Sequence, residues 1–256
     1  MSEEPQKYKI FANSNLVAEF VGKKWKEYQK KFTRNGLFFV SCPLSMTSLP
    51  LYKWVIQNAK SFEDWNKFRF VLMDEQIEGN SDYSYVLTLD PVSYEKFARD
   101  NFLSHLKKYL NSQDQILLKP ALNNFKEFDG LIETHGGLDL LILTIGPKGH
   151  YAQVMPGTKA DIGFHISKLL PEFMDYHKSS GSYKDTKIRN YGMSIGPKQV
   201  LSAKKIILII TGSRKKQLLR DYLYSYSSFN PDFPLSIIHH PKIKGKVEVA
   251  ISRDVL

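Results

Sequence analysis

Short apolar segments alternate with amphipathic segments along most of the chain. The two most apolar are Leu138–Ile145 and Lys205–Thr211, whose interiors lack the polar positions of a strand with one solvated face. Strands of this kind are buried on both faces, as in a parallel sheet. Three shorter apolar runs and one weaker candidate are also predicted to be strands: Leu37–Ser41, Phe68–Met73, Val247–Ile251 and Ile116–Lys119.

Between these strands, apolar residues recur at the spacing of a helix that covers a sheet. A helix is predicted from about Leu49, and others over Val92–Leu110, over Leu122–Thr134 and from Arg214 to about Tyr226. The segment Tyr176–Lys187 gathers Gly, Ser and Asp, and we expect it to form a mobile loop or lid.

Alternating strands and helices are typical of α/β proteins. We predict a mostly parallel, twisted sheet with helices on both faces, a Rossmann-like arrangement, in a single domain over residues 1–256. In open parallel sheets, ligands bind beyond the carboxyl ends of the strands. A binding site is therefore expected among the segments that follow strands: Ser41–Ser48, Asp74–Gln76, Gly146–Thr158 and Thr211–Lys215.

The composition is that of an ordinary globular protein, with 42% hydrophobic and 24% charged residues. The first residues contain no apolar signal segment, and the longest apolar runs are too short to span a bilayer. The single cysteine, Cys42, cannot form an internal disulfide and favours a reducing compartment. We therefore expect a cytoplasmic protein without membrane contact.

The net charge of +10 suggests an anionic partner. The lysines are dispersed and are not interleaved with aromatic residues, so we expect phosphorylated metabolites rather than nucleic acid. His239 and His240 would point to opposite faces of a strand, and no other cluster has the spacing of metal ligands. The chain also lacks a glycine-rich dinucleotide fingerprint and a Walker loop. We predict neither a metal nor a cofactor, and the sequence does not indicate an oligomeric state.

One motif follows the most apolar strand. Gly146, Gly149, His150 and Pro156-Gly157 match, in register, a turn of the form G-x-D-G-H and a following P-G pair. Further matches occur in the same order along the chain: Met73-Asp74-Glu75, Tyr191–Ile209, Thr211–Lys215 and His240-Pro241. On these motifs the chain resembles the superfamily of glucosamine-6-phosphate deaminases and 6-phosphogluconolactonases, over roughly residues 10–252.

The resemblance implies a phosphorylated sugar as ligand and assigns roles to individual residues. His150 would open the sugar ring, and Asp74, beside Glu75, would transfer a proton between adjacent carbons. Lys215 would bind the phosphate. The candidate substrate and phosphate ligands are Ser45, Thr47, Gly146, Lys148, Gly149, Arg214 and Lys215.

Three departures from the family pattern bear on the expected chemistry. Lys148 and Met155 stand where the family places carboxylates near its histidine, and losing an orienting carboxylate can cost about 10⁴-fold. Lys148 is expected to favour neutral His150 by like-charge repulsion, or to replace missing phosphate contacts. The loop Ser45–Ser48 lacks the family's glycines, and Gln76 matches neither branch of the family.

Three classes of function remain open. The chain could act as an isomerase or deaminase on an amino-sugar phosphate, as a lactone hydrolase with His150 as general base, or as a non-catalytic sugar-phosphate binder. The same residues also have structural interpretations. His150 could cap backbone groups, Asp74 and Glu75 could be solvated carboxylates, and Arg214 and Lys215 could be surface charges at a helix start.

Overall fold

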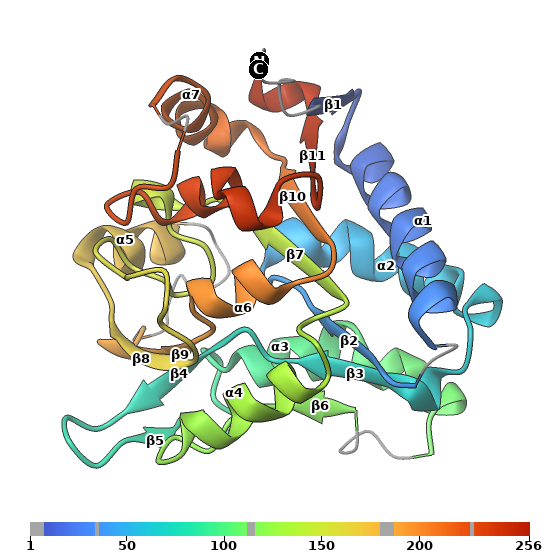
Figure 1. Ribbon diagram of the computed structural model, residues 1–256, viewed down its shortest axis with the longest axis horizontal. Coiled ribbons are helices and arrows are strands. Elements are labelled where there is room, and N and C mark those ends of the chain that lie inside the picture. The colour runs from blue at the N-terminus through green and yellow to red at the C-terminus, as the bar shows by residue number, and fades with distance from the viewer. Residues whose placement is uncertain (1–7, 34–35, 112–115, 180–186, 226–227) are drawn as a thin grey trace.

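A seven-stranded parallel sheet forms the centre of the protein (Figure 1). The computed structural model describes residues 8–33, 36–111, 116–179, 187–225 and 228–256. Every strand pair in this sheet is parallel, which confirms the predicted fold class. In spatial order the strands are β1 (Tyr8–Phe11), β11 (Val247–Ser252), β10 (Ile206–Ile210), β7 (Leu140–Thr144), β2 (Phe38–Ser41), β3 (Phe68–Val71) and β6 (Leu117–Leu118).

The order in which the chain visits these strands places a crevice between β2 and β7. From β2 the chain proceeds outward through β3 to β6, and from β7 it proceeds outward through β10 and β11 in the opposite direction. Loops that leave the carboxyl ends of β2 and β7 therefore diverge, and such a switch point is where open α/β sheets bind ligands.

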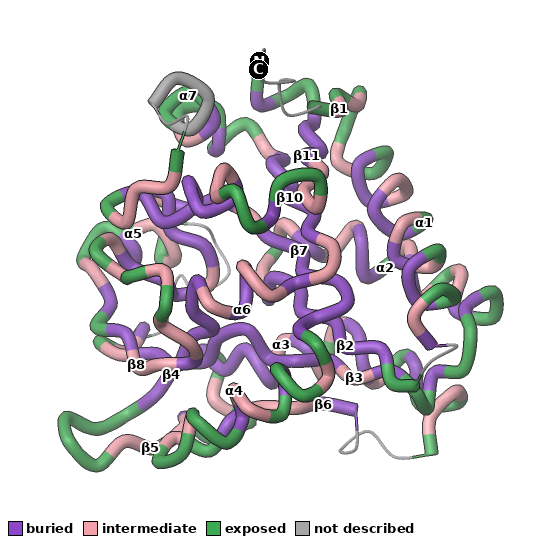
Figure 2. Tube along the Cα trace, viewed as in Figure 1, coloured by how far each residue is buried: buried purple, intermediate pink, exposed green. Residues whose placement is uncertain are grey.

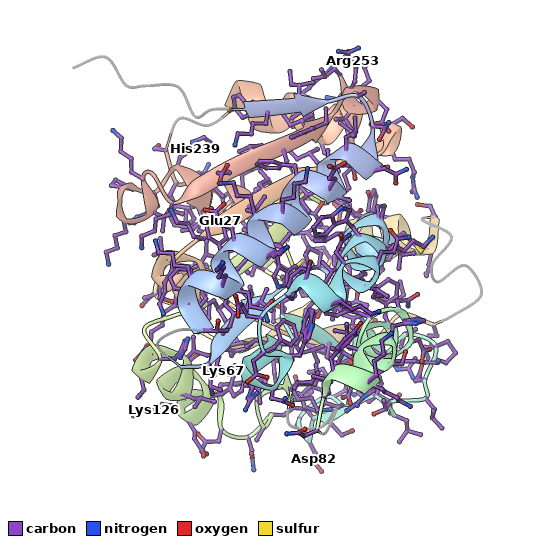
Figure 3. The ribbon with its side chains drawn as sticks, turned by 90° about the vertical axis from the view of Figure 1, so that its right-hand side faces the viewer. Glu27, Lys67, Asp82, Lys126, His239 and Arg253 are labelled. Atoms are coloured by element: carbon purple, nitrogen blue, oxygen red, sulfur yellow. The ribbon has the colours of Figure 1, made fainter. Side chains whose placement is uncertain are left out.

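Helices cover both faces of the sheet, as predicted. One face carries α1 (Ser14–Phe32), α2 (Leu49–Gln57) and α3 (Tyr94–Asn101), and the other carries α4 (Phe125–Thr134) and α6 (Pro197–Ser202). Figure 3 looks onto the first of these faces, with α1 in front. Two more helices, α5 (Pro171–Ser179) and α7 (Lys216–Ser225), complete the described set of α-helices.

A second, antiparallel sheet was not predicted. It consists of β5 (Ser84–Tyr85), β4 (Asp74–Glu78), β9 (Tyr191–Ser194) and β8 (His165–Lys168), in that order. The sequence prediction ended one strand near Asp74, whereas the chain leaves β3 at Val71 and enters β4 at Asp74. The polar segment DEQIE carries no hydrophobic alternation that would mark it as a strand, yet its first four residues are buried, where it pairs with β9 and contacts the start of α3.

Two predicted elements differ in the structure. The helix predicted over Val92–Leu110 is broken at Phe102 into α3 and a 3₁₀ segment, Leu103–Tyr109. Phe102 leaves helical geometry and its ring packs against Trp25 and Tyr52, so tertiary packing overrides helical periodicity here. The loop or lid predicted over Tyr176–Lys187 is helical as far as Ser179, and residues 180–186 lie outside the described part of the chain.

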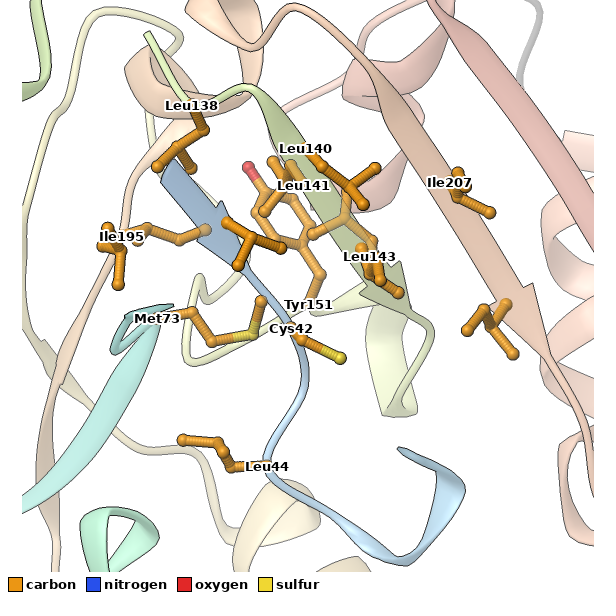
Figure 4. Packing of buried hydrophobic residues seen from close by; sticks show 14 of the residues in the cluster. Cys42, Leu44, Met73, Leu138, Leu140, Leu141, Leu143, Tyr151, Ile195 and Ile207 are labelled. Carbon is orange, nitrogen blue, oxygen red and sulfur yellow. The ribbon is translucent and has the colours of Figure 1, made fainter. Parts of the chain in front are cut away.

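Buried side chains from both sheets belong to one hydrophobic cluster. Figure 2 shows that β2 and β10 are buried along their length and that β7 is buried up to its last residue. Figure 4 shows Leu141 and Leu143 of β7 beside Tyr151 and Cys42. Such burial stabilises the folded state by about 25 cal/mol per Å² of apolar surface that is removed from water. No helix among the described residues is long and apolar enough to cross a membrane.

Candidate active site

A cavity of about 440 Å³ opens at the carboxyl ends of the central strands. Its wall includes Ser45, Met46 and Thr47 after β2, Asp74 after β3, Gly146 and His150 after β7, and Thr211–Lys215 after β10. The structure thus brings together most of the residues that the sequence singled out. Glu75, Lys148 and Gly149 lie outside the cavity wall.

His150 is buried, and its imidazole is oriented by the turn that precedes it. Nδ1 lies 2.7 Å from the carbonyl oxygen of Pro147. A carbonyl oxygen only accepts hydrogen bonds, so Nδ1 carries the proton and Nε2 retains its lone pair. The Nε2 and Cε1 atoms lie over Gly146, 2.2 Å from where a Cβ at that residue would be. His150 can therefore act as a base through Nε2.

Burial lowers the pKa of His150 to about 4, with a further lowering by the positive charge of Lys215 and an opposing effect of the hydrogen bond to Pro147. The sequence analysis expected a neutral histidine because of repulsion from Lys148. The imidazole is neutral near pH 7, but burial and Lys215 are the physical causes.

Lys148 is exposed at a tight turn, outside the cavity wall. Its backbone has a φ of 56°, a left-handed conformation that is unfavourable for lysine. Lys148 is two residues from His150 in sequence, and it is not among the causes that lower the pKa of His150. The two roles expected for Lys148, repulsion of the imidazole and contact with a phosphate, stay predictions. Met155 is buried in the hydrophobic cluster and is also absent from the cavity wall.

Asp74 begins β4, where it pairs with Ser194 of β9. Its side chain is 6% exposed and lies on the cavity wall. Burial, followed by the negative charge of Glu75, raises the pKa of Asp74 well above its ordinary value. A carboxylate with a raised pKa is a stronger base than a solvated aspartate.

Glu75 points away from the cavity and caps a helix. Its carboxylate accepts hydrogen bonds from the backbone N–H groups of Gln76, Tyr94 and Glu95 and from the hydroxyl of Ser93. Burial raises the pKa of Glu75 to about 7, against the opposing effect of these four donors. The structure thus gives Glu75 a role at the start of α3.

Lys215 is buried on the cavity wall, with 5% of its surface exposed. Its Nζ donates to the hydroxyl of Thr144, and burial lowers its pKa to about 7. Within the described part of the chain, no carboxylate forms an ion pair with Lys215. A buried ammonium without a counter-ion favours an anionic ligand.

Arg214 is exposed and contacts α5 across the cavity rim. Its guanidinium donates to the hydroxyl of Ser179 at 2.8 Å and lies 5.1 Å from the centre of the Tyr176 ring. These contacts connect the turn after β10 to the helix α5.

The loop after β2 adopts a conformation that does not require glycine. Ser45 has a φ of −148°, which is extended backbone open to any residue, and Met46–Ser48 form a 3₁₀ turn that leads into α2. The hydroxyl of Ser45 is buried and has no hydrogen-bond partner among the described residues. Ser45, Met46 and Thr47 of this loop line the cavity without glycine.

The sequence analysis missed several residues of the cavity wall. Tyr176 and His177 come from α5, Tyr94 from α3, and Asp254 from the end of the chain. No local pattern marks them, because α5 reaches the cavity only through the tertiary fold. Among the described residues, no group of three or more His, Cys, Asp or Glu side chains could hold a metal ion.

The chain is similar in sequence to a family of sugar-phosphate enzymes. The family model of "Glucosamine-6-phosphate isomerases/6-phosphogluconolactonase" matches residues 13–247. A glucosamine-6-phosphate deaminase of Caenorhabditis elegans is 28% identical over 215 residues, which cover 80% of this chain and 76% of the relative. One from Bacteroides thetaiotaomicron is 27% identical over 211 residues, which cover 80% and 74%.

Solved structures share the fold over nearly the whole chain. A monomeric glucosamine-6-phosphate deaminase superposes with a TM-score of 0.79 at 21% identity, covering 97% of this chain and 98% of its own. The 6-phosphogluconolactonase of Trypanosoma cruzi gives a TM-score of 0.67 at 16% identity, covering 100% and 97%. The match of the family model over most of the sequence shows that this chain belongs to the glucosamine-6-phosphate isomerase/6-phosphogluconolactonase family.

Proposed function

We propose that this protein binds a phosphorylated amino sugar in the cavity and converts it by isomerisation and deamination, as the names of its curated relatives describe for them. The observation that carries the proposal is the buried carboxyl of Asp74, with its raised pKa, on the same cavity wall as His150 and Lys215. Moving a proton between adjacent carbons requires such a base, whereas binding alone does not.

The phosphate is expected to bind at the turn after β10. Lys215 supplies a positive charge that lacks an ion-pair partner among the described residues. The turn Thr211–Lys215 also precedes α7, and backbone N–H groups at a helix start attract anions. Ser45 and Thr47, which line the same cavity, are expected to contribute hydroxyl groups.

The two acid–base residues divide the chemistry between them. His150, with Nε2 unprotonated, can take a proton from the ring hydroxyl and return it to the ring oxygen as the sugar opens. Asp74 can then remove a proton from one carbon of the open chain and deliver it to the neighbouring carbon. His150 lacks the carboxylates that the family pattern places near its histidine, so we expect slower turnover than in relatives that have them.

A direct assay tests the proposal. Purified protein is incubated with glucosamine-6-phosphate, and released ammonia is measured together with the affinity for the substrate. We expect tight binding and measurable, slow release of ammonia. Binding without turnover would support the non-catalytic binder instead, and the absence of binding would reject the proposal.

Lactone hydrolysis is the second candidate function, favoured by one observation. Neutral His150 with a free Nε2 could activate a water molecule against a lactone without help from Asp74. Incubation with 6-phosphogluconolactone under the same conditions distinguishes the two functions, because only the lactonase would release acid rapidly from this substrate and leave glucosamine-6-phosphate unchanged.

The substitution Gly146→Ala is expected to reduce turnover by about 10²-fold, because a displacement of about 1 Å in a catalytic group can cost that much. The new Cβ would lie 2.2 Å from Nε2 and Cε1 of His150 and would force the imidazole out of position. Measured kcat gives the result. Gly130→Ala in α4 is the matched control, since its Cβ would meet nothing within 4 Å. Equal kcat in the Gly146→Ala variant and the wild type would show that His150 does not take part in the reaction.

A further inference from the structure

Helix α5 contributes two side chains to the cavity, Tyr176 and His177. The buried ring of Phe173, one turn earlier, connects His177 to the family's histidine. Its centroid lies 4.3 Å from that of His177 and 4.8 Å from that of His150. Phe173 therefore packs between the imidazoles of His150 and His177, and both imidazoles line the cavity. The proposed function assigns no role to His177.

His177 belongs electrostatically to the same group as His150 and Lys215. Burial lowers the pKa of His177 to about 3, and the positive charges of His150 and Lys215 lower it further. Both of these groups are near enough to His177 to repel a proton from it, and both lie on the cavity wall. Three nitrogen bases, His150, His177 and Lys215, thus line the same cavity, and burial lowers the pKa of each of them.

The position of His177 in its helix places it beside the element that carries Lys215. It lies in the last turn of α5. The contacts of Arg214 with Tyr176 and Ser179 hold this end of α5 to the turn that carries Lys215. His177 and Lys215 are therefore presented to the cavity from two connected elements.

We propose that His177 is a ligand of the substrate's anionic group and holds the phosphate together with Lys215. The identity of the sugar rests on the proposed function. Binding of the anionic group by His177 can be tested with a ligand that contains no sugar. In this arrangement α5 recognises the phosphate directly, and the imidazole donates a hydrogen bond in either protonation state.

The test compares three ligands in calorimetric titrations: inorganic phosphate, glucosamine-6-phosphate and unphosphorylated glucosamine. The variant His177→Phe keeps the aromatic contact with Phe173 and removes both ring nitrogens. We expect it to weaken the binding of both phosphate-containing ligands by about tenfold or more, the worth of one hydrogen bond to a charged group. Binding of glucosamine should not change.

Two further variants complete the design. His177→Gln keeps a hydrogen-bond donor and is expected to recover part of the lost affinity. Lys178→Met removes an exposed positive charge from the adjacent position of the same helix and should leave the affinity for phosphate unchanged apart from weak screening effects.

Several outcomes would overturn the inference. They are equal affinity for phosphate in His177→Phe and wild type, an equal loss of affinity for all three ligands, and no binding of phosphate by the wild type. If the wild type binds inorganic phosphate but not glucosamine-6-phosphate, the proposed function fails, while the comparison of phosphate affinities still decides the role of His177.

Discussion

The substitution Asp74→Asn is expected to lower the kcat for glucosamine-6-phosphate by about 10³-fold, within the range that a positioned general base contributes. The amide of asparagine is close in size to the carboxyl but cannot accept and return a proton. The phosphate is assigned to Lys215 and the turn after β10, and not to Asp74, so the affinity for the substrate should change much less than kcat.

The pH dependence of the reaction provides an independent check on Asp74. Burial and the charge of Glu75 raise its pKa, so the protonated form persists to a higher pH than in an ordinary aspartate. The reaction needs the ionised form, and kcat/KM, which reports the free enzyme, should therefore rise with pH through this raised pKa. The residual activity of Asp74→Asn should lack that rise.

The matched control for Asp74→Asn is Glu78→Gln at the exposed end of the same strand, β4. Glu78 forms an exposed ion pair with Arg189, and such pairs contribute about 0–1 kcal/mol. The kcat of the Glu78→Gln variant should remain that of the wild type. A comparable decrease of kcat in both variants would mean that the substitutions disturb β4 as a whole and that the Asp74 carboxyl has no specific role.

The parallel sheet could be predicted because its strands carry their own signal. Residues 140–144 and 206–210 are buried almost throughout, and an unbroken apolar run of that length is typical of a strand covered on both faces. The antiparallel sheet could not be predicted in this way. In β4, Asp74, Glu75 and Gln76 are buried although polar, because Gln76 and Glu75 bond to groups that are distant in sequence.

The residues of the candidate site also divide into those that a local sequence signal marks and those that depend on contacts between distant segments. Asp74, His150 and Lys215 lie just beyond strand ends, so the rule that ligands bind at the carboxyl edge of a parallel sheet placed them together. Lys148 and Glu75 are equally near a strand end, but backbone geometry directs one to solvent and the other to the start of α3. His177 follows no strand, and it reaches the cavity through the packing of α5, which includes its contact with Phe173.

Replacing Lys215 by methionine is expected to weaken the binding of glucosamine-6-phosphate by about 10²-fold, the upper range for a hydrogen bond to a charged group. Methionine fills a similar volume without a charge, so the fold should be retained. The matched control is Lys216→Met, which removes an exposed lysine at the next position. We expect the affinity of that variant to remain within about twofold of the wild type, because exposed charges are screened.

The lowered pKa of Lys215 also predicts how binding depends on pH. The free protein loses the ammonium proton near pH 7, whereas a bound phosphate dianion raises this pKa again. Binding above pH 7 must then take up a proton, and affinity should fall by up to about tenfold for each further pH unit. Below about pH 6 the phosphate itself becomes singly charged, so affinity should be greatest between these limits.

The lowered pKa of Lys215 also makes the stability of the fold depend on pH. The direction of this dependence is opposite to that of a lysine in an ion pair, whose pKa is raised by folding. The folded state releases the Lys215 proton near pH 7, whereas the unfolded state holds it to about pH 10.5. The unfolded state thus binds more protons in this window, and the free energy of unfolding contributed by Lys215 rises with pH across it.

The variant Lys215→Met should therefore have a larger free energy of unfolding than the wild type near pH 7, and the two values should become similar near pH 10.5. Chemical denaturation at both pH values, together with ligand titrations, separates this effect from binding. A variant that lost stability at pH 7 and kept its affinity would show that Lys215 serves the fold and that the phosphate binds elsewhere.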